Sequence, residues 1–256
     1  MSTIFRVWET GSGLRNVAGN LLDVIFPPMT LDAGVRALTF GLSAEAWSRI
    51  TFIDDPACMG CGAQFEYALG PGARCVACEA RPRAFSRARA ACLYDETSRD
   101  PILQFKHADR QDLAPLFARW ISRAADQLVE EADAIAPVPL HRSRLFTRRF
   151  NQAAEIARGL ARLRDRTYLP DALMRRRATE SQGGKSGSGR QRNVAGAFDV
   201  PPQRARQVAG RNILLVDDVL TTGATAQGCA RAVLAAGAAR VDLAVVARVK
   251  AAATPS

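Results

Sequence analysis

The residues best suited to chemistry in this chain are two adjacent carboxylates followed by a short run of threonines and glycine. Asp217 and Asp218 end the apolar run 213–216, and the segment 221–225, which reads TTGAT, follows after two apolar residues. A continuous apolar run is typical of a strand that is covered on both faces in a parallel sheet. We expect a strand over 212–218 to deliver both acids to the carboxyl edge of the sheet, where open α/β folds bind their ligands.

Two adjacent anions repel, so the acids need a partner that offsets their charge. Vicinal ribose hydroxyls, which donate hydrogen bonds, and Mg²⁺ both meet that need. A helix expected over 224–236 offers exposed N–H groups, the positive end of its dipole and three threonine hydroxyls to a monophosphate. The phosphate-binding set is Thr221, Thr222, Gly223, Ala224 and Thr225. Acids and threonines together predict a 5-phosphoribosyl ligand, and a capped turn between strand and helix is the structural alternative.

The segment 179–189, TESQGGKSGSG, interrupts the regular pattern and is flanked by the basic runs MRRR and RQR. This composition predicts a flexible basic loop, which is a candidate lid, and an ordinary surface loop is the alternative. Gly184, Lys185 and Ser186 fit the end of a Walker A motif, but Thr179 stands where the first glycine of that motif belongs. A Walker A site is therefore disfavoured.

Four of the six cysteines have the spacing of a tetrahedral metal site, whereas Cys92 and Cys229 stand alone in apolar surroundings. The four form two C-x2-C pairs separated by thirteen residues, and they are Cys58, Cys61, Cys75 and Cys78. Such pairs supply the thiolates of a structural zinc site, and the segment between them is too short to fold without a metal. Two disulfides or a redox dithiol are the alternatives. Four protein ligands would leave a catalytic metal no open position.

The 256 residues carry a net charge of +10, and the excess lies mainly in one region. Between Arg142 and Arg211 there are 17 Lys or Arg residues against 5 Asp or Glu residues. This surplus favours polyanionic partners such as phosphorylated metabolites or nucleic acid, with an arginine-rich solvated face as the alternative. No window reaches the roughly 18 apolar residues of a membrane span, and the first residues lack a secretory signal pattern. We therefore expect a cytoplasmic protein without membrane insertion.

Strand and helix patterns alternate from about residue 90, which predicts an α/β fold with helices on both faces of a mostly parallel sheet. We expect an N-terminal extension over 1–50, a four-cysteine zinc ribbon over 51–82 and the α/β domain over 83–252. With 48% hydrophobic residues, a chain of this length can bury a full core. The expected strands cover 88–96, 133–140, 212–218 and 240–249, and the expected helices cover 101–107, 112–131, 148–163 and 224–236.

The motifs together resemble those of the ComF (ComFC, GntX-like) family, and VDDVLTTGAT at 216–225 resembles the PRPP-binding signature of type I phosphoribosyltransferases. The family's glycine before the Phe150-Asn151-Gln152 run is absent, and about thirty residues separate the FPP segment from the first cysteine. The further landmarks are LLDVIFPP at 21–28, the double CxxC, LYD at 93–95, Lys106 in LQFKH, APVPLHRSRLFTRRFNQA at 136–153, Thr179 with Gln182, and RQRNVAGAF at 190–198.

The resemblance implies a type I phosphoribosyltransferase-like fold that binds PRPP with Mg²⁺. It implies that Asp217 and Asp218 bind the ribose hydroxyls, that the threonine segment 221–225 holds the 5′-phosphate, and that Lys185 and Arg190 close over the pyrophosphate. The implied catalytic set is therefore Asp217, Asp218, Lys185 and Arg190, and the implied pyrophosphate loop is Val138, Pro139 and Leu140. Departure of pyrophosphate leaves an oxocarbenium-like centre, so Mg²⁺ and cationic side chains must offset the charge on the leaving group.

Three functions stay open at this point. The first is a glycosyltransferase reaction that moves the phosphoribosyl group from PRPP to a nitrogenous acceptor, although neither an acceptor pocket nor a general base stands out. The second is handling of single-stranded DNA in competence and DNA uptake, with competence-machinery proteins as partners; arginines supply phosphate contacts, but 7% aromatic residues give few stacking platforms. The third is a PRPP sensor without catalysis. PRPP or another 5-phosphoribosyl ligand is common to all three.

Overall fold

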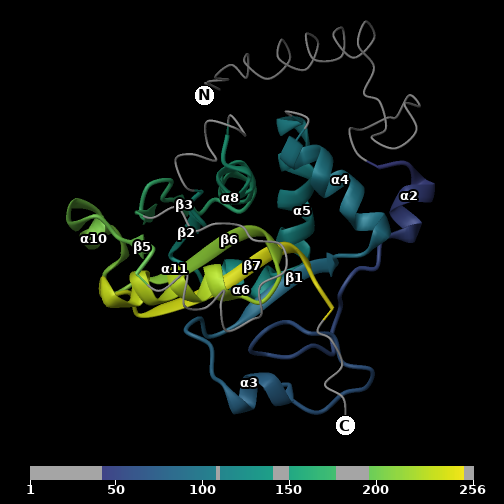
Figure 1. Ribbon diagram of the computed structural model, residues 1–256, viewed down its shortest axis with the longest axis horizontal. Coiled ribbons are helices and arrows are strands. Elements are labelled where there is room, and N and C mark those ends of the chain that lie inside the picture. The colour runs from purple at the N-terminus through teal and green to yellow at the C-terminus, as the bar shows by residue number, and fades with distance from the viewer. Residues whose placement is uncertain (1–41, 108–109, 141–149, 177–195, 251–256) are drawn as a thin grey trace, which may run out of the picture. The chain divides into compact units, whose positions relative to one another are not determined.

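The computed structural model describes residues 42–107, 110–140, 150–176 and 196–250 (Figure 1). From Arg49 onward the described residues belong to one compact unit, and the short helix α2 (Ala44–Arg49) ends at the first residue of this unit. Most of the predicted N-terminal extension, Lys185 and Arg190 lie outside the described residues. No helix within the described segments combines the length and the apolar character that crossing a bilayer requires.

The described residues build a parallel sheet of five strands in the order β1-β7-β6-β2-β3. The central strands β6 (Asn212–Leu220) and β7 (Arg240–Arg248) pair along their whole length. β1 (Ala88–Leu93) flanks β7, while the short strands β2 (Ala134–Pro137) and β3 (Thr167–Tyr168) extend the sheet beyond β6. Nearly every residue of β7 is buried, as expected of a strand that is covered on both faces. The predicted parallel α/β fold is confirmed.

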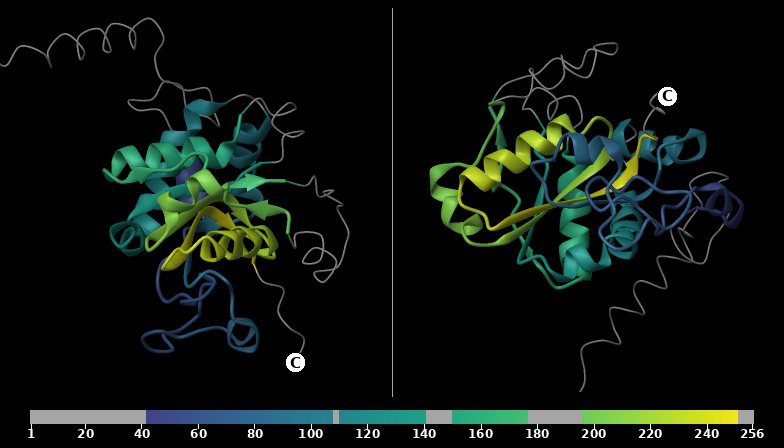
Figure 2. Two further views of the ribbon diagram at one scale, coloured as in Figure 1. Left: turned by 90° about the vertical axis from the view of Figure 1, so that its left-hand side faces the viewer. Right: turned by 90° about the horizontal axis from the view of Figure 1, so that it is seen from below.

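Helices cover both faces of this sheet (Figure 2). On one face α5 (Ala114–Ala124) contacts β1 and β7, and α8 (Gln152–Leu163) contacts β2 and β6. On the other face α11 (Ala224–Ala235) contacts β6 and β7. The apolar positions of α8 recur at helical spacing, and Ile156 and Leu160 among them are fully buried. Burial of this apolar stripe against β2 and β6 holds α8 in place.

A second, two-stranded sheet was not predicted from the sequence. β4 (Met174–Arg175) pairs antiparallel with β5 (Phe198–Asp199), and β5 contacts α11. The helix α10 (Pro202–Val208), also not predicted, follows β5 along the chain. Strands of two residues are too short to show an alternating pattern, and a seven-residue helix covers only two turns of the helical period.

The single long helix predicted over 112–131 is wrong, because the chain forms a 3-10 turn (Gln111–Leu113), α5 and a separate short helix α6 (Asp126–Glu130). The break falls at Ala125, whose φ of −115° and ψ of 27° lie outside the helical range. Leu128, on the far side of the break, is still buried. The apolar spacing thus continues across the interruption, which is why it predicts one helix where two exist.

The segment that carries the paired cysteines has little regular structure. Its helix α3 (Val76–Ala80) starts directly after Cys75 and contains Cys78, and an isolated bridge between Ala57 and Gln64 stands where a ribbon of strands was expected. The segment joins the sheet just before this, where Phe52 forms a bridge with Cys92 of β1. The domain boundaries at residues 50 and 82 stay a prediction.

Candidate functional site at the carboxyl edge of the sheet

Asp217 and Asp218 lie inside β6, which continues to Leu220, two residues beyond the end predicted from the sequence. The strand continues because its neighbour β7 continues: Leu220 still pairs with Arg248, the last residue of β7. On its other side β6 loses its partner earlier, since β2 ends at Pro137. The acids therefore lie at the carboxyl edge of the sheet with β7 on one side and the loop that follows β2 on the other.

The two carboxylates start from opposite faces of the sheet, because successive side chains of a strand alternate. Asp217 shares a face with Leu215, which belongs to the same core cluster as Cys229 of α11. Burial of the Cys229 thiol raises its pKa, and so does the nearby charge of Asp217, which supports this placement. Asp218 is directed to the face that carries α8.

Asp218 forms an ion pair with Lys106 of helix α4 (Glu96–His107), with Nζ 2.9 Å from Oδ2. The two side chains are largely buried, with exposed fractions of 15% and 17%. The preceding residue, Phe105, is fully buried and makes edge-on contacts with Phe117 and Phe150 at centroid distances of 5.3 and 5.7 Å. Aromatic packing of α4 thus holds one ammonium group beside the second acid.

Burial raises the pKa of Asp217 to about 7, and the adjacent Asp218 carboxylate adds to this shift. The effect persists although the Asp218 N–H donates to Asp217 Oδ1 at 2.9 Å and the charges of Lys106 and Arg175 favour ionisation. At neutral pH the first acid is therefore divided between its protonated and ionised forms. A ligand that brings hydroxyl donors or a divalent cation to this edge would favour the ionised form.

Gly223 sits at the junction between β6 and α11 with a φ of +79°, in the left-handed region that favours glycine. A Cβ at this position would also lie 3.1 Å from Nη1 of Arg83. The same Nη1 donates a hydrogen bond to the backbone oxygen of Thr222 at 3.0 Å. The glycine is thus required by its own backbone conformation and by the arginine that braces the turn.

Helix α11 begins at Ala224 and presents its first turn to the threonine segment. The first N–H groups of a helix have no partner within it, and the one of Ala224 reaches Thr222 Oγ1 at 3.4 Å. Thr221 and Thr222 are exposed, and Thr225 is half-buried in the first turn. N–H groups of the first turn, accessible hydroxyls and the positive end of a twelve-residue helix suit a phosphate group.

The loop that follows β2 runs beside the acids. The Val138 N–H donates to the backbone oxygen of Val216 at 2.9 Å, so the segment 138–140 starts next to the end of β6. Asn151 fixes this loop from the other side, because its Nδ2 donates to the Val138 oxygen at 3.1 Å. The same side chain caps α8 through a bond from the Ala153 N–H at 3.1 Å. The helix start is therefore capped without the glycine that the family pattern has before Phe150.

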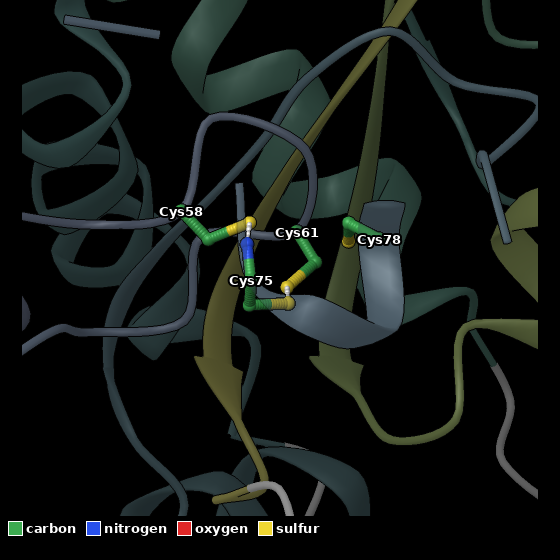
Figure 3. Close-up of side chains that lie close together, drawn as sticks. All are labelled: Cys58, Cys61, Cys75 and Cys78. Carbon is green, nitrogen blue, oxygen red and sulfur yellow. Dashed lines mark hydrogen bonds between the residues drawn. The ribbon is translucent and has the colours of Figure 1, made fainter. Parts of the chain in front are cut away.

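The four predicted metal ligands lie together (Figure 3), with all sulfur atoms within 4.8 Å of one another. They are Cys58, Cys61, Cys75 and Cys78. Cys61 Sγ and Cys75 Sγ are 3.7 Å apart, close to the roughly 3.8 Å that tetrahedral zinc–sulfur bonds of about 2.3 Å would impose. None of the six cysteines forms a disulfide, and Cys92 and Cys229 are buried outside the cluster. The predicted grouping is confirmed, and the donor set fits a four-coordinate metal.

Arg248 connects the cysteine cluster to the sheet. This buried side chain donates from Nη1 to the backbone oxygen of Cys61 at 2.8 Å and lies 3.5 Å from Cys61 Sγ. A hydrogen bond from Cys58 lowers the pKa of the Cys61 thiol, and Arg248 contributes in the same direction. Arg248 also pairs with Leu220 of β6, the residue directly before the threonine segment. The cysteine cluster is therefore anchored to the sheet next to the start of that segment.

Three cations at this edge were not assigned a role from the sequence: Lys106, Arg83 and Arg175. The apolar pattern around Lys106 indicates that its helix packs on the core but not that its ammonium group reaches Asp218. Arg83 lies in a run of basic residues with no pattern of its own. Arg175 lies in a strand of two residues, and its guanidinium group stands over the Phe198 ring at 5.3 Å. None of these placements has a local signal.

Comparison with known proteins gives consistent results. Residues 150–256 match the model of the phosphoribosyl transferase domain. The DNA utilization protein YhgH of Escherichia coli K12 is 31% identical over 204 residues, which cover 77% of this chain and 86% of that protein. Competence protein F of Haemophilus influenzae is 29% identical over 191 residues, which cover 66% of this chain and 80% of that protein.

Solved structures with a detectable likeness include the glutamine PRPP amidotransferase of B. subtilis in complex with ADP and GMP. The sequences are 18% identical, the TM-score is 0.36, and the match covers 56% of this chain but only 30% of that enzyme. An allosteric regulatory enzyme of purine biosynthesis is 21% identical with a TM-score of 0.35, and the match covers 25% of it.

Proposed function

This chain belongs to the ComF family of proteins with a phosphoribosyltransferase domain, and we propose that it binds PRPP with Mg²⁺ at the carboxyl edge of β6. The observation that carries the proposal is the arrangement of three groups at one edge of the sheet: the Asp217–Asp218 pair, the threonine segment 221–225 at the start of α11, and the loop 138–140 beside them. Each group matches the charge or polarity of one part of PRPP.

In this proposal the ribose lies against the acids and the 5′-phosphate lies against α11. Asp217 and Asp218 accept hydrogen bonds from the two ribose hydroxyls, which lowers the electrostatic cost of holding two carboxylates together. The first N–H groups of α11 and the hydroxyls of Thr221, Thr222 and Thr225 donate to the phosphate. Because Asp217 is only partly ionised near neutral pH, binding would be accompanied by release of a proton from this residue.

Mg²⁺ would supply positive charge for the pyrophosphate, next to the acids and the loop 138–140. That loop offers backbone groups to the pyrophosphate, and Lys185 and Arg190, which lie outside the described residues, are proposed to close over it. When the bond between C1 and the pyrophosphate oxygen breaks, the electron pair leaves with pyrophosphate, and C1 is left electron-deficient. Charge on the leaving group must then be offset and water excluded.

Calorimetry with PRPP and Mg²⁺ tests the ligand. The wild type is expected to bind, and Asp218→Asn is expected to weaken binding by roughly tenfold or more, because a hydrogen bond to a charged acceptor is lost. Asp54→Asn is the matched control, since Asp54 is an acid with a side chain 69% exposed in a surface pair. Equal affinity of wild type and Asp218→Asn would overturn the proposal.

We propose that the bound PRPP serves a glycosyltransferase reaction with a nitrogenous acceptor, in which a C1–N bond replaces the C1–O bond. Release of pyrophosphate in the presence of a panel of bases and amines tests this proposal. An acceptor-dependent release that Asp218→Asn abolishes is the expected result. Binding of PRPP without release for any acceptor would instead leave the role of a non-catalytic PRPP sensor.

A role in handling single-stranded DNA is a second candidate, favoured by the names of the relatives and by the net charge of +10. Non-specific phosphate contacts would make the affinity fall steeply as salt concentration rises. Fluorescence anisotropy of a labelled oligodeoxythymidine over a salt series measures this directly. A flat salt dependence, or no binding at low salt, would remove this candidate.

We propose that the cysteine cluster holds one structural Zn²⁺. Four thiolates and one Zn²⁺ carry a net charge of −2, which the buried Arg248 guanidinium beside Cys61 would partly offset. Metal analysis is expected to return about one equivalent for the wild type and much less for Cys58→Ser. Cys92→Ala is the control, because this buried thiol lies outside the cluster and its replacement is expected to leave the metal in place.

A further inference from the structure

A cavity of about 370 Å³ lies between helix α11 and the segment that links the cysteine cluster to the sheet. It is lined by Ala77, Arg81, Pro82, Arg83, Thr222, Gln227 and Arg231. Only Thr222 belongs to the set proposed above to hold the 5′-phosphate. The remaining residues come from α3, from the linker that follows it and from successive turns of α11, so the cavity is beside the phosphate cradle and not within it.

Three of the lining side chains are arginines, and no carboxylate lines the cavity among the described residues. Arg81 and Arg231 are exposed, and neither side chain has an acceptor within the described part of the chain. Like charges gathered without a counter-charge repel, and an anionic ligand would remove that repulsion. The guanidinium group presents several donors in a fixed plane that matches the oxygens of phosphate.

Arg83 is the most constrained of the three. Its Nη1 is fixed by the bond to the Thr222 oxygen at 3.0 Å, while its Nε is buried without a hydrogen-bond partner among the described residues. A buried donor without a partner is costly and rare in folded proteins. Because Arg83 lines the cavity, an oxyanion there is a natural acceptor for its remaining donors. Gln227, which is largely buried, adds an amide group to the same wall.

We propose that this cavity is a second oxyanion site, which takes the phosphate or diphosphate group of a small ligand independently of the 5′-phosphate cradle. Its volume lies at the lower end of the range of small-molecule sites, which is roughly 300–1,000 Å³. No aromatic side chain of the described segments lines it, so it lacks the stacking surface that a single-stranded nucleic acid uses. The ligand is therefore a compact phosphate-bearing molecule.

Calorimetric titration of the full chain with inorganic diphosphate, without Mg²⁺ and with the phosphate cradle saturated by ribose 5-phosphate, tests the site. The wild type is expected to bind diphosphate, and the double variant Arg81→Gln with Arg231→Gln is expected to bind it at least roughly tenfold more weakly. Arg119→Gln is the matched control, an exposed arginine on α5 on the other face of the sheet. The double variant Arg81→Lys with Arg231→Lys should keep most of the affinity.

Diphosphate affinity that is the same in wild type and in the double glutamine variant, or that falls equally in the Arg119→Gln control, would overturn the inference. If the double glutamine variant loses oligodeoxythymidine binding but keeps diphosphate binding, the inference is also overturned, because the two arginines would then belong to a DNA-binding surface. Adenosine diphosphate titrated in parallel separates the two sources of the phosphate group, since tighter binding than inorganic diphosphate indicates a nucleotide.

The inference and the proposed function can fail separately. Ribose 5-phosphate that does not bind, together with diphosphate binding that depends on Arg81 and Arg231, would reject the PRPP proposal and leave this site standing. If instead ribose 5-phosphate binds equally well to the wild type and the double variant, and diphosphate affinity does not depend on Arg81 and Arg231, the second site is rejected and the PRPP proposal stands.

Discussion

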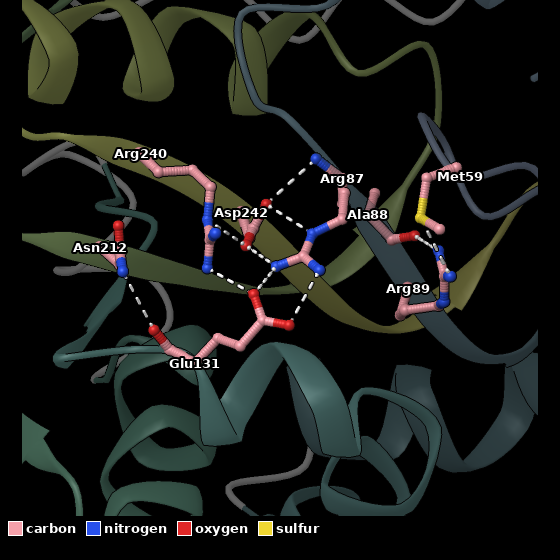
Figure 4. A network of polar contacts seen from close by, with 8 residues as sticks. All are labelled: Met59, Arg87, Ala88, Arg89, Glu131, Asn212, Arg240 and Asp242. Atoms are coloured by element: carbon pink, nitrogen blue, oxygen red, sulfur yellow. Dashed lines mark hydrogen bonds and ion pairs between the residues drawn. The ribbon is translucent and has the colours of Figure 1, made fainter. Parts of the chain in front are cut away.

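Two groups of charged side chains lie at opposite ends of the same central strands, and only one of them is balanced. At the amino end Arg87 and Arg240 meet Glu131 and Asp242 (Figure 4). Arg87 Nη2 lies 2.7 Å from both Glu131 Oε2 and Asp242 Oδ2, and Arg240 Nη2 lies 2.8 Å from Glu131 Oε2. Asp242 raises the pKa of Arg87, and Arg87 lowers that of Glu131. Each charge therefore stabilises its partners.

At the carboxyl end two acids are adjacent, and within the described residues Lys106 is the cation that forms an ion pair with them. The raised pKa of Asp217 reflects this excess of negative charge, since burial and the Asp218 carboxylate disfavour its charged form. The difference between the two ends separates charged residues that stabilise the fold from those that we propose bind the ligand. Charges that neutralise one another hold the fold together, whereas charges left in excess are available to a ligand at some cost in stability.

Breaking the balanced end should have the largest effect. Asp242→Ala removes a carboxylate that is only 5% exposed and leaves Arg87, whose side chain is 14% exposed, with half of its counter-charge. We expect the free energy of unfolding to fall by about 3–5 kcal/mol, measured by urea denaturation at pH 7.5. PRPP affinity under folding conditions should change by less than about twofold, because the site lies at the other end of the strands. An equal loss for the exposed control Asp54→Ala would contradict the comparison.

Removing a negative charge from the carboxyl end should increase the free energy of unfolding instead of lowering it. Asp217 has its pKa raised to about 7, so between about pH 4 and pH 7 the folded protein binds more protons than the unfolded chain. Stability therefore falls as pH rises through this window, and the full cost of ionising Asp217 in the folded protein is reached above pH 7. Asp217→Asn removes it and should be more stable than wild type by about 2 kcal/mol at pH 8, with little difference at pH 4.

Urea midpoints of wild type and Asp217→Asn between pH 4 and pH 8 measure this difference, and Asp171→Asn, an exposed acid outside the site, is the control. Parallel profiles for wild type and Asp217→Asn would mean that Asp217 is not the titrating group. PRPP affinity is expected to fall in the same variant, so that one substitution gains stability and loses binding.

Lys106→Met should increase the charge imbalance at the carboxyl end and lower stability. Without the ammonium group 2.9 Å from Asp218, the repulsion between the two carboxylates is offset less, and we expect the free energy of unfolding to fall by about 1 kcal/mol at pH 8. The loss should shrink at pH 5, where Asp217 is protonated. Lys106→Arg keeps the charge and is the control. The same loss at both pH values would show that packing of the side chain and not its charge is what matters.

The sequence predicts those parts of the molecule whose signal is local. The acids and the threonine segment lie close together in 217–225, so the sequence alone places them at one edge of the sheet, and their binding of a ribose and a phosphate stays a prediction. The paired cysteines are nearly as local, because their spacing carries the ligand count. The strands β6 and β7 are long and apolar enough to be predicted, and α11 starts at the predicted residue and ends one residue before its predicted end.

What the sequence does not predict depends on packing between distant segments. Lys106 reaches Asp218 because Phe105 is buried between two aromatic rings, and Arg83 reaches Thr222 from a linker 139 residues away. The strand end at Leu220 is set by its neighbour Arg248. Each of these contacts is determined by tertiary packing, which overrides the local sequence pattern.

The smallest effect on stability is expected for an ion pair at the solvent-exposed surface. Arg204 of α10 and Asp171 form an ion pair with side chains 37% and 59% exposed. Water screens such a pair and the side chains lose entropy in forming it, so Arg204→Ala should change the free energy of unfolding by less than about 0.5 kcal/mol. Urea denaturation at low and high salt measures it, and the two curves should nearly coincide. A loss comparable to that of Asp242→Ala would show that pairing alone stabilises this fold, whereas the expected contrast attributes the stability at the amino end to burial of the pairs.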